Sequence, residues 1–149
     1  MELGVAFGVM GAVISFALAG AGSGVALGMT GRAAAGVVAE DSKKFGQTLV
    51  LQAIGTTSGI YGLLMGFLIL TKALTVTDTT TGLYLLFAGI PMGLVGMVAS
   101  IEQGKALVSG IILIGKKSGE MAKAMIYAAM VETMQIFGLL FSFIIYNSI

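Results

Sequence analysis

Four long apolar stretches constrain this chain more than any other feature of its sequence. Polar segments of about a dozen residues or fewer separate them. A helix needs roughly 20 apolar residues to cross the hydrocarbon core of a bilayer, so each stretch is long enough to span it. The sequence therefore predicts an all-α membrane protein with four transmembrane helices in two antiparallel hairpins. The stretches run at about residues 3–31, 46–71, 82–114 and 121–146.

The composition supports this assignment and excludes most enzyme chemistry. The chain is 57% hydrophobic and 10% charged, which leaves too few charges to cover a water-soluble surface. It contains no histidine, no cysteine and no GxxxxGK[ST] phosphate loop. Histidine and thiol catalysis, zinc or iron–sulfur binding and ATP binding by a phosphate loop are therefore excluded. We expect a protein that is not catalytic by itself and needs no cofactor.

Basic residues mark the two sides of the membrane. They gather in the first and third connections between the apolar stretches, whereas the second connection and the two termini together have only Lys72. Cytoplasmic loops are enriched in Lys and Arg, so we expect these two connections in the cytoplasm and both termini outside. The formal net charge is only +1, which gives no indication of nucleic-acid binding. The basic residues of these connections are Arg32, Lys43, Lys44, Lys116, Lys117 and Lys123.

The sequence also repeats itself. The segment IYGLLMGFLIL at 60–70 matches IFGLLFSFIIY at 136–146, an offset of 76 in residue number. A weaker match between the first and third stretches aligns Ser23 with Gln103 at an offset of 80. A hairpin returns the chain to its starting side, so both copies share one orientation and an inverted-repeat transporter is disfavoured. We interpret the chain as a first hairpin at 1–75 and a second at 76–149.

Glycines spaced four apart mark one face of the first helix. Gly20, Gly24 and Gly28 form one such row, and Gly4 and Gly8 continue it on the same helix. Small residues at this spacing let helix backbones approach closely in lipid. Two interpretations remain open. The row packs inside one four-helix bundle, or it forms a narrow inner wall made of many copies side by side.

Glu132 is the strongest functional candidate in the sequence. It lies nearly midway between the ends of the last apolar stretch at 121–146, and therefore near the middle of the membrane. An ionised carboxylate there costs at least about 2.5 to 3.5 kcal/mol on insertion scales. The group must therefore be protonated, paired or bound to a cation. A purely structural alternative is a neutral Glu132 that hydrogen-bonds a neighbouring helix.

Gln103 is predicted to lie at the same depth as Glu132. In an antiparallel hairpin, residues equally far from the turn lie side by side. With the turn near Ser118, Gln103 and Glu132 are almost equally far from it along the chain, one before it and one after. At a rise of about 1.5 Å per residue, the two positions are nearly level. A carboxylate and a carboxamide can therefore meet in the second hairpin.

Hydroxyl groups of the first hairpin reach a similar depth. With its turn near residues 39–40, Ser23 is level with Thr56, and Thr57 and Ser58 follow directly. Hydroxyl, carboxamide and carboxylate oxygens are hard ligands that suit an alkali cation. Each hydroxyl has an alternative role, because Ser and Thr in helices often bond their own backbone. The cluster therefore points to a cation site more strongly than any single hydroxyl does.

A second charged pair lies inside the third apolar stretch. Glu102 and Lys105 are three residues apart, a spacing that lets them neutralise each other on one helix. We favour a structural ion pair. Two alternatives stay open: Glu102 is a second titratable carboxylate, or Lys105 places a positive charge near the exit route of an ion.

Several motifs in this frame resemble one known family. The chain contains KFGQTLVLQ, GIYG at 59–62, EQGKA at 102–106 and AAMVET at 128–133. With the duplicated hairpin, they are similar to the double-hairpin proteolipid, or K subunit, of bacterial V-type and archaeal-type ATPases. That subunit forms the membrane rotor ring.

The resemblance implies a set of ion-binding residues. In sodium-pumping members, a glutamate, a glutamine, a Thr-Gln pair and a backbone carbonyl bind the ion, and a tyrosine bonds the glutamate. This sequence departs from the pattern at Ser58, where the family has its second glutamine, so a water or Thr56 would complete the shell. The implied residues here are Glu132, Gln103, Thr57, Ser58, the carbonyl of Ile54 and Tyr61.

The resemblance also implies a function. Identical subunits would form a ring in the cell membrane, and each Glu132 would carry Na⁺, or alternatively H⁺, past a static a/I-type membrane subunit. A central-stalk connector would contact the cytoplasmic loops near Lys43 and Lys117, and lipid would cover the rest of the outer surface. Thr56 occupies the repeat position of Glu132, so four helices carry one acid. This ratio favours an ATP-driven pump over a synthase.

Two other classes have features in common with this chain. Small multidrug antiporters also have four helices and one essential glutamate, but their acid lies in the first helix, whereas Glu132 lies in the fourth stretch. A passive structural pore would not depend on Glu132, so a Glu132→Gln variant would keep its activity.

Overall fold

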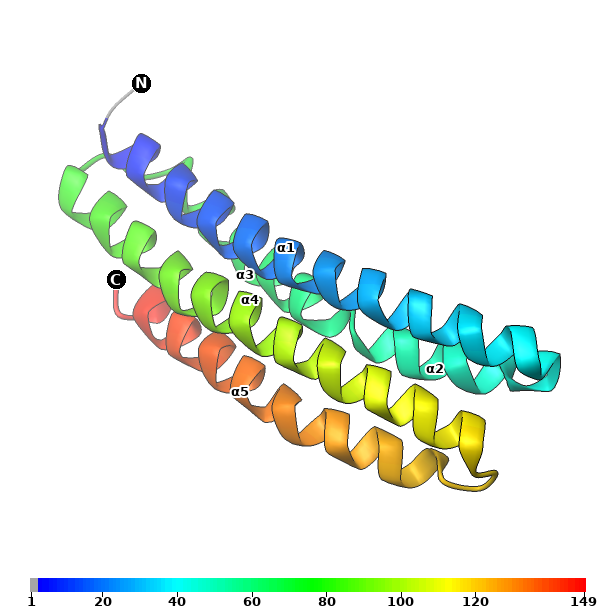
Figure 1. Ribbon diagram of the computed structural model, residues 1–149. Helices are drawn as coiled ribbons and strands as arrows, with labels where there is room; N and C mark the ends of the chain where they lie inside the picture. The colour runs from blue at the N-terminus through cyan, green and yellow to red at the C-terminus, as the bar shows by residue number, and fades with distance from the viewer. Residues whose placement is uncertain (1–2) are drawn as a thin grey trace.

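The computed structural model describes residues 3–149 as a long bundle of helices (Figure 1). Four segments are long and apolar enough to cross a membrane, which confirms the four helices predicted from the sequence. The second segment consists of a short 3₁₀ helix and two consecutive α-helices. The elements are α1 (Leu3–Glu40), η1 (Ser42–Lys44), α2 (Phe45–Ile54), α3 (Thr57–Ala73), α4 (Thr79–Lys116) and α5 (Met121–Asn147).

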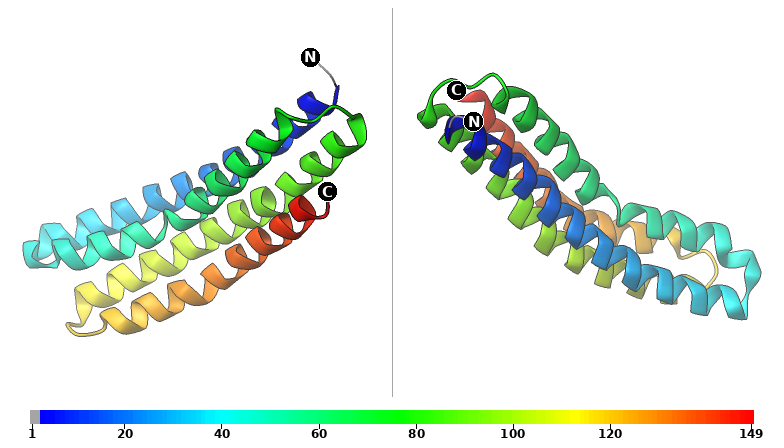
Figure 2. Two further views of the ribbon diagram at one scale, coloured as in Figure 1. Left: turned by 180° about the vertical axis from the view of Figure 1, so that it is seen from behind. Right: turned by 90° about the horizontal axis from the view of Figure 1, so that it is seen from above.

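The helices form two antiparallel hairpins that lie side by side. The start of α1 and the end of α5 lie at one end of the bundle, and the turns that follow α1 and α4 lie at the other (Figures 1 and 2). The inner helices α1 and α4 make the most extensive contact. Helix α3 packs mainly on α1, and α5 packs mainly on α4. The outer helices α3 and α5 meet over a short stretch, so the two hairpins join chiefly through α1 and α4.

Glycines allow the close approach of α1 and α4. A Cβ atom added at Gly22 would lie 2.6 Å from the carbonyl oxygen of Met97, and one at Gly93 would lie 2.7 Å from that of Ile14. Gly104 similarly faces Ala26. Side chains at these positions would force the backbones apart, so the glycines permit the van der Waals packing that joins helices in lipid.

The glycine row predicted on α1 divides into two parts. Gly4 faces the backbone of Asp78 and Gly8 faces Ala73, so this part packs within the chain. A Cβ atom at Gly24 or Gly28 would meet nothing within 4 Å among residues 3–149. The first interpretation therefore applies to one end of the row, while its other end lies on the outer surface of the chain.

Helix α1 is longer than its apolar stretch. The sequence predicted an end near residue 31, but the helix continues to Glu40, because RAAAGVVAE contains good helix formers and no proline. The turn begins at Asp41, whose side chain accepts a 3.0 Å hydrogen bond from the backbone N–H of Lys43. The turn of the first hairpin therefore lies one to two residues later than predicted.

The outer helix of the first hairpin is broken, although the sequence predicted one helix over 46–71. Helix α2 ends at Ile54 and α3 begins at Thr57. Two glycines and two threonines in GTTSG are weak helix formers. The backbone N–H of Gly59 donates to the hydroxyl of Ser23 on α1, at 2.8 Å. This bond fixes the start of α3 against the inner helix, and the change in direction is visible in Figure 2.

Lysines connect the two hairpins at both ends of the bundle. The ammonium group of the nearly buried Lys44 donates to the Ser118 hydroxyl at 3.1 Å, which links the two turns. At the other end, Lys72 donates to the carbonyl oxygens of Tyr146 (3.2 Å) and Ile149 (2.6 Å). The last carbonyls of a helix have no partner within it, so Lys72 satisfies groups at the end of α5.

Candidate functional site

Three helices meet at Glu132. The hydroxyl of Tyr61 on α3 donates to Oε1 of Glu132 at 2.9 Å, and Nε2 of Gln103 on α4 lies 3.5 Å from Oε2. Glu132 itself lies on α5 and is partly buried. Gln103 and Glu132 therefore meet, as their equal distances from the turn predicted. Tyr61, which only the resemblance indicated, is the closest hydrogen-bond donor to the carboxylate.

Gln103 is fully buried, and both the nitrogen and the oxygen of its carboxamide form hydrogen bonds. Its Nε2 also donates to the carbonyl oxygen of Ala128 at 3.3 Å. Its Oε1 accepts a 2.9 Å hydrogen bond from Nε2 of Gln135. Two partners thus hold the orientation in which the amide nitrogen of Gln103 faces Glu132.

Gln135 is a member of this cluster that the sequence reasoning missed. It is fully buried, three residues after Glu132 on the same face of α5. Its Oε1 lies 3.4 Å from the hydroxyl of Thr57, which also donates to the carbonyl oxygen of Ile54 at 3.0 Å. The sequence does contain a signal for Gln135. It is a carboxamide in an otherwise apolar segment, on the same helix face as Glu132.

The remaining hydroxyls of the predicted cluster point elsewhere. The buried Ser58 donates to the carbonyl oxygen of Gly96 on α4 at 2.9 Å. Thr56 donates to the carbonyl of Ala53, in its own chain segment, at 2.8 Å. Successive residues of a helix point about 100° apart, so three adjacent hydroxyls do not face one site. Of the three, Thr57 is the one that contacts the Gln135–Gln103–Glu132 network.

Ser23 contacts Gly59 and not Thr56, with which the sequence reasoning had aligned it. The difference has a simple cause. Helix α1 ends at Glu40, so the turn is centred near Asp41 and the matching position on the outer helix moves toward its C-terminal end. The carbonyl end of α2 at Ile54 and the start of α3 at Thr57 consequently lie at the depth of the Glu132 network.

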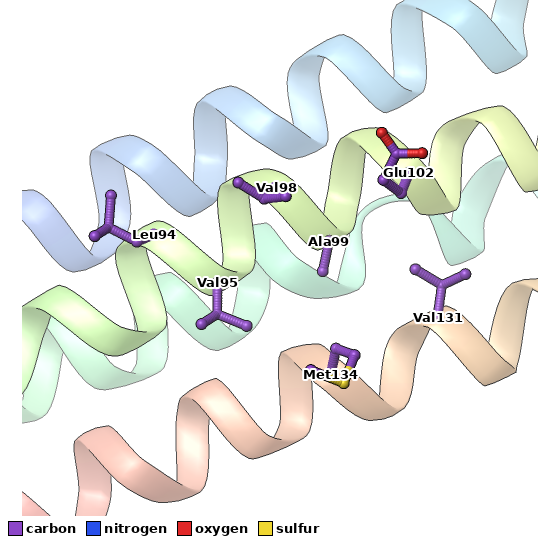
Figure 3. Close-up of a pocket in the computed structure, with 7 residues that line it drawn as sticks. All are labelled: Leu94, Val95, Val98, Ala99, Glu102, Val131 and Met134. Carbon is purple, nitrogen blue, oxygen red and sulfur yellow. The ribbon is translucent and has the colours of Figure 1, made fainter.

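Glu102 and Lys105 form the ion pair expected from their spacing. Their side chains are 2.6 Å apart, and each is more than half exposed, at 55% and 59%. Glu102 borders a groove of about 590 Å³ between α4 and α5, whose other lining residues are apolar (Figure 3). Gln103 is buried while its neighbour Glu102 is exposed, so the pair lies on a different face of α4 from the Glu132 network.

The network is rich in oxygen, and among residues 3–149 no positively charged group pairs with Glu132. Within residues 3–149 the two ion pairs are Lys105–Glu102 and Lys123–Glu120. The groups that contact Glu132 are the neutral donors Tyr61 and Gln103. Among the described residues there is no cluster of three acids that could hold a multivalent metal. One carboxylate amid neutral oxygens suits a univalent cation or a proton.

Comparison with known proteins identifies two matching segments in the chain. The C-subunit family of ATP synthases matches at residues 10–69 and again at 86–145. The starts of the two matches are separated by the same offset as the repeat at 60–70 and 136–146.

Two curated proteins are similar over nearly the whole chain. V-type sodium ATPase subunit K of Enterococcus hirae is 37% identical over 142 residues, covering 95% of this chain and 91% of the relative. A-type ATP synthase subunit K of Methanocaldococcus jannaschii is 39% identical over 138 residues, covering 93% of this chain and 60% of the relative.

Proposed function

Because this chain belongs to the C-subunit family of ATP synthases, we propose that it is a rotor-ring subunit of a V-type ATPase that carries Na⁺ on Glu132. The observation that carries the proposal is the junction of α3, α4 and α5 at Glu132, where neutral hydrogen-bond donors hold a carboxylate in the middle of a helix long and apolar enough to cross a membrane. The identity to a V-type sodium ATPase subunit supports the choice of ion. The chain is then a multi-pass membrane protein that leaves ATP hydrolysis to other subunits.

Neutralisation of Glu132 is the physical basis of the proposed mechanism. The carboxylate is partly exposed on α5, and an ionised group facing lipid costs at least about 2.5 to 3.5 kcal/mol. A bound cation removes most of this cost. An occupied copy can therefore turn through lipid, whereas an empty one is stable only beside an aqueous path in a static subunit. Rotation in one direction then moves the ion across the membrane.

The proposed ligands come from both hairpins. Tyr61 orients Glu132 through its 2.9 Å hydrogen bond and is not itself a ligand in this scheme. The break between α2 and α3 supports a role for the Ile54 carbonyl, since broken membrane helices offer backbone oxygens to ions. Ser58 would join the shell only by leaving the carbonyl of Gly96, and Thr56 remains an accessory candidate. The proposed direct ligands are Glu132, the Oε1 oxygen of Gln103 through its second lone pair, Thr57 and the carbonyl oxygen of Ile54.

Identical copies, a static membrane subunit of the a/I type and a central-stalk connector are the proposed partners. The open glycines Gly24 and Gly28 and the apolar groove of Figure 3 are surfaces that neighbouring copies could cover. We place the turns at Lys43 and Lys117 in the cytoplasm, at the connector, because basic residues concentrate there. One acid for four helices favours a pump over a synthase.

A carbodiimide that reacts with protonated carboxyl groups tests the choice of ion. The intact ATPase complex is treated in membranes at mildly acidic pH, with and without millimolar Na⁺. We expect labelling at Glu132, protection by Na⁺ but not by the same concentration of K⁺, and no labelling of the Glu132→Gln variant. If Na⁺ gave no protection, the second candidate, a rotor subunit that carries H⁺, would replace the sodium proposal.

The mass of the detergent-solubilised protein tests the ring itself. A rotor subunit should remain in a large homo-oligomer. A monomer or dimer would exclude the rotor and return attention to the small antiporter class, which shares four helices and one acid.

A further inference from the structure

We propose that Gln135 is an additional ligand of the transported cation and that it distinguishes Na⁺ from H⁺. This inference rests on the proposed function, and it assigns a role to a residue that neither the motifs nor the resemblance indicated. The starting observation is that Gln135 is fully buried in a transmembrane helix. A buried carboxamide is costly unless its oxygen and nitrogen are both satisfied. Both of its partners belong to the proposed ion site.

Gln135 and Thr57 place two oxygens at the spacing of cation ligands. Oxygens bind hard cations such as Ca²⁺, which has nearly the radius of Na⁺, at about 2.3 to 2.6 Å, so two ligands at right angles lie about 3.3 to 3.7 Å apart. Oε1 of Gln135 and the hydroxyl oxygen of Thr57 are 3.4 Å apart. They come from different hairpins, α5 and α3. The pair therefore has the spacing of two oxygens that share one cation.

The Thr57 hydroxyl cannot donate fully to both of its neighbours. A threonine hydroxyl has one hydrogen to donate. That of Thr57 has a shorter contact with the Ile54 carbonyl, at 3.0 Å, than with Gln135, at 3.4 Å. When the hydrogen points to Ile54, the Thr57 and Gln135 oxygens face each other through lone pairs. A cation between them would convert a weak or repulsive contact into a favourable one.

Gln135 also contacts Gln103, another proposed ligand. Nε2 of Gln135 donates to Oε1 of Gln103 at 2.9 Å, and the other end of the Gln103 amide faces Glu132. Gln135 therefore also holds the orientation of a neighbouring ligand. Proton binding needs only the Glu132 carboxylate, whereas Na⁺ needs several fixed oxygens. Loss of Gln135 should consequently weaken Na⁺ binding and leave proton binding nearly unchanged.

The test uses the assembled ATPase and the variant Gln135→Met, which keeps the length of the side chain but has no carboxamide. We expect the Na⁺ concentration that half-protects Glu132 from carbodiimide to rise about 10- to 100-fold, as when partners of metal ligands are removed. The pH dependence of labelling without Na⁺ should stay the same. Ser142→Ala is the matched control, because Ser142 is also fully buried on α5 and accepts a hydrogen bond, from the N–H of Met92 at 2.9 Å, outside the site. It should change neither measurement.

The possible outcomes separate this inference from the proposed function. If wild-type Glu132 is protected by Na⁺ and Gln135→Met is protected equally well, Gln135 is not a ligand, while the proposed function stands. If Na⁺ does not protect the wild type, both proposals fail. A Gln135→Met protein whose ring dissociates is replaced by Gln135→Asn, which keeps a shorter carboxamide. An intact Gln135→Asn ring with wild-type Na⁺ protection would overturn the ligand role.

A double variant provides a positive test. Ser58 is the neighbour of Thr57 on α3, at the position where the resemblance led us to expect a glutamine. In Gln135→Ala, adding Ser58→Gln offers a second carboxamide from the other hairpin. We expect this change to recover at least about tenfold of the lost Na⁺ affinity, the lower end of the effect of removing a ligand's partner. If Gln135 acted only by packing in α5, a glutamine on α3 would recover none of it, and that result would contradict the ligand role.

Discussion

The two hairpins form a hydrogen bond between the same two positions of the repeat, but with different residues. In the first, the backbone N–H of Gly59 donates to the Ser23 hydroxyl at 2.8 Å. In the second, Nε2 of Gln135 donates to Oε1 of Gln103 at 2.9 Å. The outer partners, and likewise the inner partners, are related by the two offsets of the sequence repeat. A glycine and a serine in one hairpin thus correspond to two glutamines in the other.

Another pair of contacts follows the same register. Ser15 donates to the carbonyl oxygen of Gly62 at 3.2 Å in the first hairpin. At the corresponding positions of the second, a Cβ atom added at Gly138 would lie 2.9 Å from that of Val95. The inner and outer helices therefore keep one alignment in both hairpins, and the difference between them lies in the side chains at the level of Glu132.

The backbone differs at this level as well. Thr56 in the first hairpin lies in the break between α2 and α3, whereas its counterpart Glu132 lies within the continuous α5. Broken helices expose carbonyl oxygens, and continuous ones present only side chains. In the proposed site, the first hairpin contributes a backbone oxygen at Ile54 together with the Thr57 and Tyr61 hydroxyls, and the second contributes the acid and two carboxamides. The proposed site therefore needs both hairpins, because neither contains the complete set.

The largest expected effect comes from removing the acid of the second hairpin. Glu132→Gln should reduce ATP-driven Na⁺ uptake by proteoliposomes containing the whole complex to background, because a neutral amide cannot balance the charge of a cation. Thr71→Val, a control change in the first hairpin, removes a hydroxyl that bonds the carbonyl of Leu68 at 2.9 Å, away from the site, and should leave uptake nearly unchanged. Uptake that survives Glu132→Gln would instead support a passive pore.

Moving the acid to the first hairpin should not restore transport. The variant Thr56→Glu with Glu132→Gln has the same number of carboxylates as the wild type. At the level of residue 56, however, the first hairpin offers Ser23 and Gly59, whereas Glu132 has Gln103 and Tyr61. We expect background Na⁺ uptake from this variant in the same assay. Recovery would mean that the acid alone, without its oxygen network, is sufficient.

The helices, the repeat and one contact of the site could be predicted from the sequence. Length and apolarity are enough to identify a membrane helix, and the distance from a turn is enough to align Gln103 with Glu132. The break at Gly55–Thr56 was not predicted, because weak helix formers such as those of GTTSG do not by themselves interrupt an apolar helix. The hydrogen bond that fixes the start of α3 joins Gly59 to Ser23, which lie far apart in the sequence on different helices. A continuous helix was the natural expectation for an apolar stretch.

The directions of the side chains at the site could not be predicted from the sequence either. Gln135 is about two residues farther from the turn of its hairpin than Gln103. The two residues still form a hydrogen bond because both glutamine side chains are long. Ser58 follows Thr57 directly, yet it faces Gly96 on α4. The position of each residue along its helix was predictable. The direction of its side chain around the helix axis was not, because that direction depends on how α3 packs between its two neighbours.

A smaller effect is expected when the hydrogen bond to the acid is removed. Tyr61→Phe leaves the ring but not the hydroxyl that donates to Glu132 at 2.9 Å. Its repeat counterpart is Phe137, so the change makes the hairpins alike at this position. Hydrogen bonds to charged groups contribute about 1.5 to 3 kcal/mol, which corresponds to a loss of about 10- to 150-fold in Na⁺ affinity. Na⁺-dependent ATPase activity measures it, with the exposed Tyr84→Phe as control. An unchanged affinity would remove Tyr61 from the site.

The smallest expected effect concerns the register shared by the hairpins. Ala at Gly62 would press on the Ala19 side chain and the Ser15 carbonyl, and Ala at Gly138 would press on Val95. Overpacking costs about 1 to 3 kcal/mol, so both variants should unfold at lower temperature in detergent by similar amounts. Gly46→Ala is the control, since its Cβ atom would meet nothing within 4 Å among residues 3–149. If only one of the two variants were destabilised, the hairpins would share a sequence pattern, but their inner and outer helices would not be packed equally tightly. Equal destabilisation would instead place the functional difference between them in the polar residues around Glu132.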